Sequence, residues 1–361
     1  MDYRVRGADE LPSPALIYYK DVIVKNTLRT IGIAGGAQRL WPHMKTHKTG
    51  ELLDMQRAYG ITRVKCATVN EAILAAEHGM EHILWAYPLV GPNIGRYFDL
   101  VKRFENAVIY GLVDDRGVLG RFSDEAVKRG MTAKLFIDVN MGMDRTGVPY
   151  RMAEGFLLAA RELPGIEICG LHCYDGHIHD TDFDERCAHV RPASDEMTAL
   201  GRRYGLMMIM GGTPSFPCHA LEEGVFLSPG TLFVSDHGYR ASFPDVDVVP
   251  AAAVLSRVIS HPADGLFTLD AGTKAVSADP RGPRGVIAGM EDVTEDVLSS
   301  EEHWVFRMKE GHERPAIGTE LYIIPTHICT TTCLYDAVYV AENGAITGKW
   351  QVAARDRTVI L

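Results

Sequence analysis

The chain has 361 residues, which at about 150 residues per domain predicts two domains with room for a large core. Hydrophobic residues make up 46% and charged residues 23%, a composition typical of globular proteins and not of disordered ones. The formal net charge of −10 argues against a nucleic acid or an anionic membrane as the main partner. The start MDYRVRGADE is polar and the apolar runs are too short to span a bilayer. The seven cysteines show no disulfide-framework spacing, so we expect a cytoplasmic protein with reduced thiols.

Short apolar runs alternate with amphipathic helical patterns from about residue 39 to residue 235. The expected strands are Leu40–Lys45, Val64–Ala67, His82–Tyr87, Ala107–Tyr110, Lys134–Val139, Glu167–Leu171, Leu206–Met210 and Val225–Leu227. The expected helices are Lys20–Ala34, Glu51–Tyr59, Asn70–His78, Asn93–Phe104, Arg116–Arg129 and Met152–Leu163. Continuously apolar strands that alternate with helices indicate a parallel sheet covered on both faces. About eight such units, without a G-x-G-x-x-G fingerprint, predict an α/β fold with a closed (β/α)8 TIM-type barrel.

The pattern changes after about residue 240, where short β-type runs are separated by turn residues. These runs are Val254–Ser260, Leu266–Leu269, Trp304–Met308, Glu320–Ile324, Ala337–Val340 and Thr347–Val352. They predict a mostly antiparallel β domain, which the N-terminal strand Ala15–Tyr19 would join. We therefore expect a barrel over residues 20–240 and a β domain over residues 241–361 together with residues 1–19.

Catalytic residues of parallel barrels lie at the C-terminal ends of the strands, so these ends carry the candidates. The first expected strand runs into a cluster of two histidines and two lysines, His43, Lys45, His47 and Lys48. One interpretation is a solvated basic turn. The other is a lysine held in the barrel mouth for Schiff-base chemistry, where partial burial frees the amine. On strand periodicity Lys45 and His43 point the same way, and Lys48 is expected at the start of the next helix.

The fifth and sixth strand ends carry further polar groups. Arg145 follows the fifth strand between two glycines, either as a surface side chain on a tight turn or as a group facing a planar acceptor in the barrel. The sixth strand end holds His172, Tyr174, His177 and His179, a density that favours a site over random placement.

Two glycine turns follow the seventh and eighth strands, where barrels commonly bind phosphate. In the first, Gly211 and Gly212 let backbone N–H groups point at an anion, and Thr213 and Ser215 add hydroxyls. The second, Leu227–Thr231, repeats this chemistry. Together the turns predict a phosphorylated ligand.

The β domain contributes one candidate metal pair, His327 and Cys329. On a strand, residues two apart share a face, so both side chains would reach one ion, and nitrogen with sulfur suits Zn²⁺. The alternative is a buried pair whose hydrogen bonds are satisfied within the protein.

Four segments, in this order, resemble the D-threonine aldolase and D-serine dehydratase family: Pro42–Lys48, Met141–Gly147, Gly211–Ser215 and Pro325–Cys329. The first matches that family's P-H-x-K-T-H-K pattern, although Trp41 stands where the pattern usually has arginine, which leaves the surroundings of Lys45 and the substrate details open. These are fold-type III pyridoxal 5′-phosphate (PLP) enzymes whose N-terminal barrel is related to that of alanine racemase. The resemblance extends over nearly the whole chain.

The resemblance implies a set of roles for these residues. Lys45 would carry PLP covalently, Gly211, Gly212 and Thr213 would hold its phosphate, Arg145 would lie beside its ring, Tyr174 would line the site, and His327 with Cys329 would bind a divalent metal, zinc or manganese. The resemblance also implies a homodimer with a shared active site.

We expect an aldolase that cleaves a β-hydroxy D-amino acid to glycine and an aldehyde, with His177 as the base that takes the hydroxyl proton. The alternative is a dehydratase of D-serine or 3-hydroxy-D-aspartate, in which Lys45 takes the α-proton and a 2-oxo acid and ammonia leave. An amino-acid racemase would have no use for the metal pair. A non-catalytic PLP carrier would lack the second domain, and a zinc hydrolase would be colourless.

Overall fold

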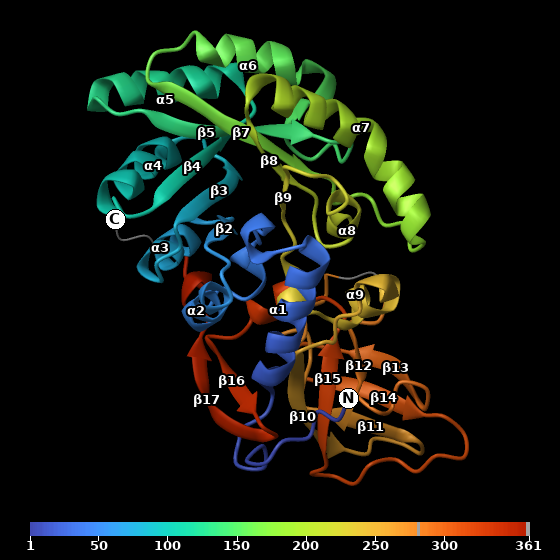
Figure 1. Ribbon diagram of the computed structural model, residues 1–361. Coiled ribbons are helices and arrows are strands. Elements are labelled where there is room, and N and C mark those ends of the chain that lie inside the picture. The colour runs from blue at the N-terminus through green and yellow to red at the C-terminus, as the bar shows by residue number, and fades with distance from the viewer. Residues whose placement is uncertain (280–281, 359–361) are drawn as a thin grey trace. The chain divides into compact units, whose positions relative to one another are not determined.

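A computed structural model describes residues 1–279 and 282–358 (Figure 1). The chain divides into two compact units. One, the β unit, comprises Met1–Thr30 and Thr231–Arg355, and the other, the barrel unit, comprises Ile31–Gly230 and Asp356–Thr358. The division falls inside helix α1 (Lys20–Ala34) and again directly after the second glycine turn. No helix in the described residues is both long enough and apolar enough to cross a membrane.

The barrel unit is a curled parallel sheet in the strand order β2-β3-β4-β5-β7-β8-β9, with the short β6 on β5. Its strands are β2 (Arg63–Cys66), β3 (His82–Pro88), β4 (Val108–Val113), β5 (Ala133–Asn140), β6 (Val148–Pro149), β7 (Ile166–Tyr174), β8 (Met207–Met210) and β9 (Phe226–Leu227). Its helices are α2 (Gly50–Ala58), α3 (Val69–Glu77), α4 (Pro92–Arg103), α5 (Arg116–Arg129), α6 (Ala153–Arg161), α7 (Phe183–Tyr204) and α8 (Phe216–His219). The predicted α/β alternation is confirmed.

The barrel closes through the segment that was expected to form its first strand. The Trp41 N–H donates to the Leu227 carbonyl at 2.8 Å, and the Lys65 N–H donates to the Pro42 carbonyl at 2.7 Å, so this segment bridges β9 and β2. It forms isolated bridges instead of the regular strand predicted over Leu40–Lys45, because Pro42 has no N–H to donate and the chain then turns into a 3-10 helix, Met44–Thr46.

Aromatic side chains fill the barrel interior. The fully buried Trp41 ring contacts Tyr110, Phe136 and Phe226, with ring centroids 5.3 to 5.7 Å apart, and its Nε1–H donates to the Val64 carbonyl at 2.9 Å. Such interdigitated rings make the barrel a packed core rather than a pore. The residue that departs from the family pattern is thus a core residue of the segment that carries Lys45.

The β unit contains a nine-stranded sheet in which every pairing is antiparallel except that of β1 with β16. Its strands are β1 (Ala15–Tyr19), β10 (Ala252–Ser260), β11 (Leu266–Leu269), β12 (Gly285–Ile287), β13 (Thr294–Ser299), β14 (Trp304–Met308), β15 (Glu320–Pro325), β16 (Ala337–Glu342) and β17 (Ala345–Gln351). The unit also contains two short helices, α9 (His237–Ser242) and α10 (Ile328–Thr332), and the first part of α1 up to Thr30. The prediction of a mostly antiparallel β domain that includes Ala15–Tyr19 is confirmed.

Candidate functional site

The structure distinguishes between the two lysines of the first strand end. Lys48 is buried, and its Nζ donates to Glu71, whose other oxygen accepts from the Ala67 N–H at 2.6 Å. Lys45 is half-buried, and its Nζ has no hydrogen-bond or ion-pair partner in residues 1–279 and 282–358. Lys48 therefore has a structural role in the buried pair with Glu71, whereas the amine of Lys45 is available to react.

His43 orients the backbone around Lys45. Its Nδ1 accepts a hydrogen bond from the Lys45 N–H at 3.3 Å and caps the short 3-10 helix. Burial, together with the neighbouring charges of Lys45 and Lys65, holds the pKa of His43 well below its ordinary value. A neutral ring is what this geometry requires, because only an unprotonated Nδ1 can accept.

Arg145 projects from a turn that its neighbours fix tightly. The side chain of Asn140 accepts from the Gly142 and Asp144 N–H groups at 2.9 and 3.1 Å. Gly147 has φ +104°, and a Cβ there would lie 2.5 Å from the Asn140 nitrogen, so this close approach requires glycine. These contacts restrict the conformation of the turn from which the exposed Arg145 projects.

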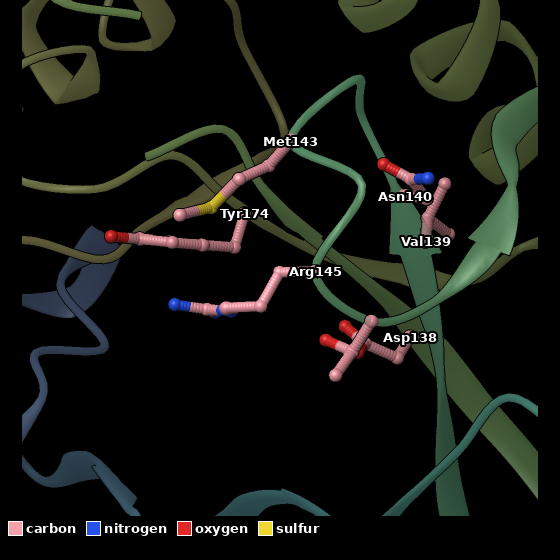
Figure 2. A pocket seen from close by; sticks show the side chains of 7 residues that line it. Asp138, Val139, Asn140, Met143, Arg145 and Tyr174 are labelled. Carbon is pink, nitrogen blue, oxygen red and sulfur yellow. The ribbon is translucent and has the colours of Figure 1, made fainter. Parts of the chain in front are cut away.

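The Arg145 guanidinium lies over the face of Tyr174, 4.7 Å from the ring centroid. Figure 2 shows the two side chains extending side by side, with the Asp138 carboxylate nearby. A small hollow lined by these three residues together with Val139, Asn140, Met143 and Thr146 opens here. The predicted pair Arg145 and Tyr174 is therefore brought together at the ends of β5 and β7, in an arrangement suited to a planar anionic ligand.

His177 lies next to this turn. A Cβ on Gly142 would come within 3.1 Å of its Nε2, and its ring meets that of His189 edge-on at 6.1 Å. In the described chain its buried Nδ1 has no hydrogen-bond partner. His179, from the same cluster, is exposed. The structure therefore singles out His177 as the histidine with an unused nitrogen beside the arginine turn.

The first glycine turn is held from below by a buried hydrogen-bond network. Asp175 accepts from the Ser215 hydroxyl at 2.5 Å and from His219 Nε2 at 2.7 Å, and Ser215 Oγ in turn accepts from the Gly212 N–H at 3.1 Å. Burial favours the neutral carboxyl, but His219 and the two hydrogen bonds outweigh it and hold the pKa of Asp175 below its usual value. Asp175 is therefore a charged anchor of the turn.

Both the backbone conformation and the lack of room for a side chain require glycine in this turn. Gly211 has φ +76°, and a Cβ on Gly212 would lie 2.7 Å from Cε2 of Tyr174. The Thr213 hydroxyl accepts from the Gly230 N–H at 3.2 Å, which joins the two predicted phosphate turns. Ser215 is fully buried within the network, so its contact with a phosphate remains a prediction, and the role visible here is to hold the turn.

A buried lysine that the sequence reasoning did not single out lies at the same strand ends. Lys65 Nζ is 3.0 Å from His172 Nε2, and His172 Nδ1 is 2.7 Å from Asp138. The signal was a charged residue inside the otherwise apolar run Val64–Ala67. Asp138, Asp175 and His219 were also missed, because their partners come from distant parts of the chain.

The candidate metal pair lies in the β unit, and the structure corrects its local setting. Strand β15 ends at Pro325 and α10 begins at Ile328, so Cys329 lies in a short helix and the expectation that both residues share one strand face is wrong. The two side chains nevertheless meet, because His327 caps that helix. Their mutual hydrogen bond, with a contribution from Asp279, raises the pKa of His327 to about 9.

Carboxylates and hydroxyls surround this pair. His327 Nδ1 is 2.5 Å from Asp279 Oδ2, and the Cys329 sulfur is 3.4 Å from the Thr231 hydroxyl. The buried Asp236 accepts from the Ile328 N–H at 3.1 Å, and burial raises its pKa to about 6. A carboxylate on one nitrogen of a histidine is the usual support for a metal on the other. In residues 1–279 and 282–358 no group of three or more acidic, histidine or cysteine side chains is placed to hold a metal ion.

Comparisons with known proteins place these features in a family. The model for the alanine racemase N-terminal domain matches residues 20–234, and that for a putative serine dehydratase domain matches residues 251–341. A D-threonine aldolase of Arthrobacter is 30% identical over 88% of this chain and 85% of its own length. A 3-hydroxy-D-aspartate aldolase of Paracoccus denitrificans is 29% identical over 96% and 93%, and a D-threo-3-hydroxyaspartate dehydratase of Delftia is 24% identical over 93% and 96%.

Solved structures agree with this placement. The D-threonine aldolase of Filomicrobium marinum superposes with a TM-score of 0.86 at 25% identity and covers 98% of both chains. A D-threo-3-hydroxyaspartate dehydratase, a cysteine-to-alanine variant in the metal-free form, has a TM-score of 0.82 at 21% identity and covers 95% of this chain and 98% of its own.

Proposed function

This chain belongs to the family of D-threonine aldolases and D-serine dehydratases, fold-type III PLP enzymes that act on D-amino acids, and we propose that within it the protein is a PLP- and divalent-metal-dependent D-threonine aldolase. The proposed reaction breaks the Cα–Cβ bond of a β-hydroxy D-amino acid. The hydroxyl carbon leaves as an aldehyde, and the α-carbon takes a proton to give glycine. The observation that carries the proposal is the half-buried Lys45, whose amine has no partner in the described residues. It occurs in a chain that is similar to a D-threonine aldolase over most of the length of both proteins.

The barrel residues fit PLP. An available amine at Lys45, a two-glycine turn that leaves no space for a Cβ, and a cation over an aromatic face are three separate features that this cofactor needs. Lys45 would hold the cofactor covalently, Gly211, Gly212 and Thr213 would bind its phosphate, and Arg145 with Tyr174 would flank its ring. When bound, PLP delocalises negative charge that develops on the substrate's α-carbon.

The donor set in the β unit fits a divalent ion. His327 and Cys329 supply nitrogen and sulfur, and Asp279 orients the histidine ring from its other side. In the dehydratase structure with the cysteine-to-alanine substitution the metal is absent, and another variant of that enzyme replaces a histidine two positions earlier, the same spacing as His327 and Cys329. A cation held here would stabilise charge on a substrate oxygen.

Two residues of this chain would move protons. His177 would take the proton from the β-hydroxyl through the nitrogen that has no partner in the described chain. The Lys45 amine would be the group that gives a proton to the α-carbon. The proposed reaction therefore requires both His177 and Lys45, because each moves a different proton.

The second candidate is a dehydratase that releases a 2-oxo acid and ammonia. The observation in its favour is the cysteine in the metal pair, because a dehydratase with a cysteine-to-alanine substitution was solved in the metal-free form. In that case Lys45 would take the α-proton, and the metal would stabilise the departing hydroxide. We further propose a homodimer, which light scattering of the purified protein would test.

Substitution of the two lysines tests the cofactor assignment. Lys45→Ala is expected to abolish the PLP adduct that borohydride fixes to the chain, as located by peptide mass spectrometry. Lys48→Ala is the matched control: it breaks the buried pair with Glu71 and lowers stability, but it leaves the adduct in place. Loss of the adduct in Lys48→Ala with retention in Lys45→Ala would overturn the assignment.

A further inference from the structure

Lys65 is an unusual residue for the place it occupies. It lies in strand β2, beside the segment that closes the barrel, and only 3% of it is exposed. Its backbone N–H donates to the Pro42 carbonyl, so the position of Lys65 is fixed relative to the segment that carries Lys45. Buried lysines are rare and require a compensating partner.

The partner of Lys65 is a histidine and not a carboxylate. A carboxylate only accepts hydrogen bonds, so Asp138 Oδ1 fixes the proton of His172 on Nδ1, 2.7 Å away. His172 Nε2 is then an acceptor, and Lys65 Nζ donates to it at 3.0 Å. The three side chains, drawn from β2, β7 and β5, are each at most 5% exposed and form a line from an amine to a carboxylate.

Several charged side chains near the ends of the neighbouring strands influence the pKa of Lys65. Lys45 and Arg145 are cations, Asp138 and Asp175 are carboxylates, and each carboxylate is already bonded to a histidine, His172 or His219. The neutral His43 also lies near, and the face of the Tyr174 ring is 5.7 Å from Lys65 Nζ. Burial, followed by the charge of Lys45, lowers the pKa of Lys65 to about 7.

We propose that Lys65 is the proton-exchanging residue of the cofactor site, which takes up a proton through the Asp138–His172–Lys65 line when an anionic ligand such as PLP enters. This inference rests on the proposed function. Lys65 acts through its charge and through His172, and no contact with the cofactor is required of it.

The sign of the effect follows from linkage. Without an anion, the buried Lys65, when charged, faces the half-buried Lys45 and the exposed Arg145, so its proton is held weakly. A phosphate or carboxylate that enters adds negative charge, which stabilises the protonated form and raises the pKa of Lys65. The protonated site binds the anion better, so the affinity for PLP falls as the pH rises above 7. Since half of the Lys65 amines are neutral at a pKa of about 7, the uptake from this residue at pH 7 is at most about half a proton per chain.

Calorimetric titration of the full chain, freed of cofactor, with PLP measures this uptake directly. The titration is run at pH 7 in two buffers of different ionisation enthalpy, and the difference in heat gives the number of protons bound. Two variants are compared with the natural protein: Lys65→Gln keeps a donor toward His172, and Lys65→Arg keeps the charge. In both, we expect the number of protons taken up on PLP binding to be lower by up to about half a proton per chain. Lys65→Arg should also flatten the dependence of PLP affinity on pH between 6 and 8.

Lys128→Met, on the exposed face of α5, is the control and should leave the uptake unchanged. An uptake in both Lys65 variants equal to that of the natural protein would overturn the inference, while the visible absorbance of bound PLP would leave the proposed function intact. Absence of PLP binding by the natural protein would overturn both. Because the readout is a proton count and a pH profile, a merely structural role for Lys65 would not reproduce the expected result.

Discussion

Replacement of Asp175 by asparagine is expected to loosen the glycine turn that we propose to hold the phosphate of PLP. Asp175 accepts two hydrogen bonds, one from Ser215 and one from His219, and a neutral amide oxygen accepts them less strongly. The amide NH₂ would also face one of the two donors. The Gly212 N–H, which depends on Ser215 Oγ, would lose its fixed position as a consequence.

The magnitude follows from burial. The side chains of Asp175 and His219 are 2% and 1% exposed, and breaking such a buried pair by removal of the charged partner costs about 3–5 kcal/mol. We therefore expect the free energy of unfolding of the barrel unit to fall by about this amount. PLP affinity, followed by visible absorbance, should fall as well.

The same loop supplies a matched control. Asp180 and His189 form a second aspartate–histidine pair at 3.0 Å, but their side chains are 32% and 55% exposed, and exposed pairs contribute at most about 1 kcal/mol. Urea denaturation followed by circular dichroism compares Asp175→Asn with Asp180→Asn. Equal effects of the two substitutions would refute the reasoning, because the Asp175 pair is buried and also bonded to Ser215, whereas the Asp180 pair is partly exposed.

The pH dependence provides a further check on this pair. The folded pKa of Asp175 lies below its unfolded value, so its stabilisation is present in full above the unfolded pKa of about 4 and is lost as the pH falls through the folded pKa. The difference in stability between the natural protein and Asp175→Asn should therefore stay constant from pH 8 to pH 5 and shrink only in stronger acid. A difference that vanishes near pH 6 would contradict an ionised Asp175.

Three more outcomes are expected. His327→Ala should lower bound metal, measured by atomic absorption, together with turnover; full activity in the metal-free variant would exclude the metal's role. EDTA should abolish turnover of the natural protein while the yellow colour of PLP remains, and a colourless protein would instead favour a zinc hydrolase. His177→Phe should lower kcat at least about a hundredfold, the usual contribution of a general base, without loss of the PLP absorbance; an unchanged kcat would assign the hydroxyl proton to another group.

Much of the barrel was predictable because its signals are local. Apolar runs of strand length alternate with helical patterns, and the polar residues follow the runs at the predicted mouth of the barrel. Arg145 was singled out in this way because it follows a strand whose apolar pattern is plain, and Lys45 because it ends the expected first strand. The segment Leu40–Lys45 was misjudged as a regular strand because Pro42 interrupts its hydrogen bonding, and the bridges on its two sides become visible only in the closed barrel.

Contacts between distant strands were not predictable in the same way. Lys65 meets His172 across 107 residues of sequence, and Asp175 meets His219 across 44. The side chain of a strand residue points to one face or the other by parity, so a single residue of error in the strand register would reverse each assignment. His327 and Cys329 were paired on the expectation of a strand, whereas they meet because His327 caps a helix whose first N–H is held by Asp236.

The central claim is tested most directly by product analysis of the purified protein, loaded with PLP and a divalent ion. D-threonine, D-serine and D-threo-3-hydroxyaspartate are each incubated with the protein, and the products are separated by chromatography, with a sample lacking the ion as control. The proposed aldolase predicts glycine and an aldehyde, acetaldehyde from D-threonine, in the presence of the ion. Ammonia and a 2-oxo acid without glycine would contradict the aldolase and establish the dehydratase.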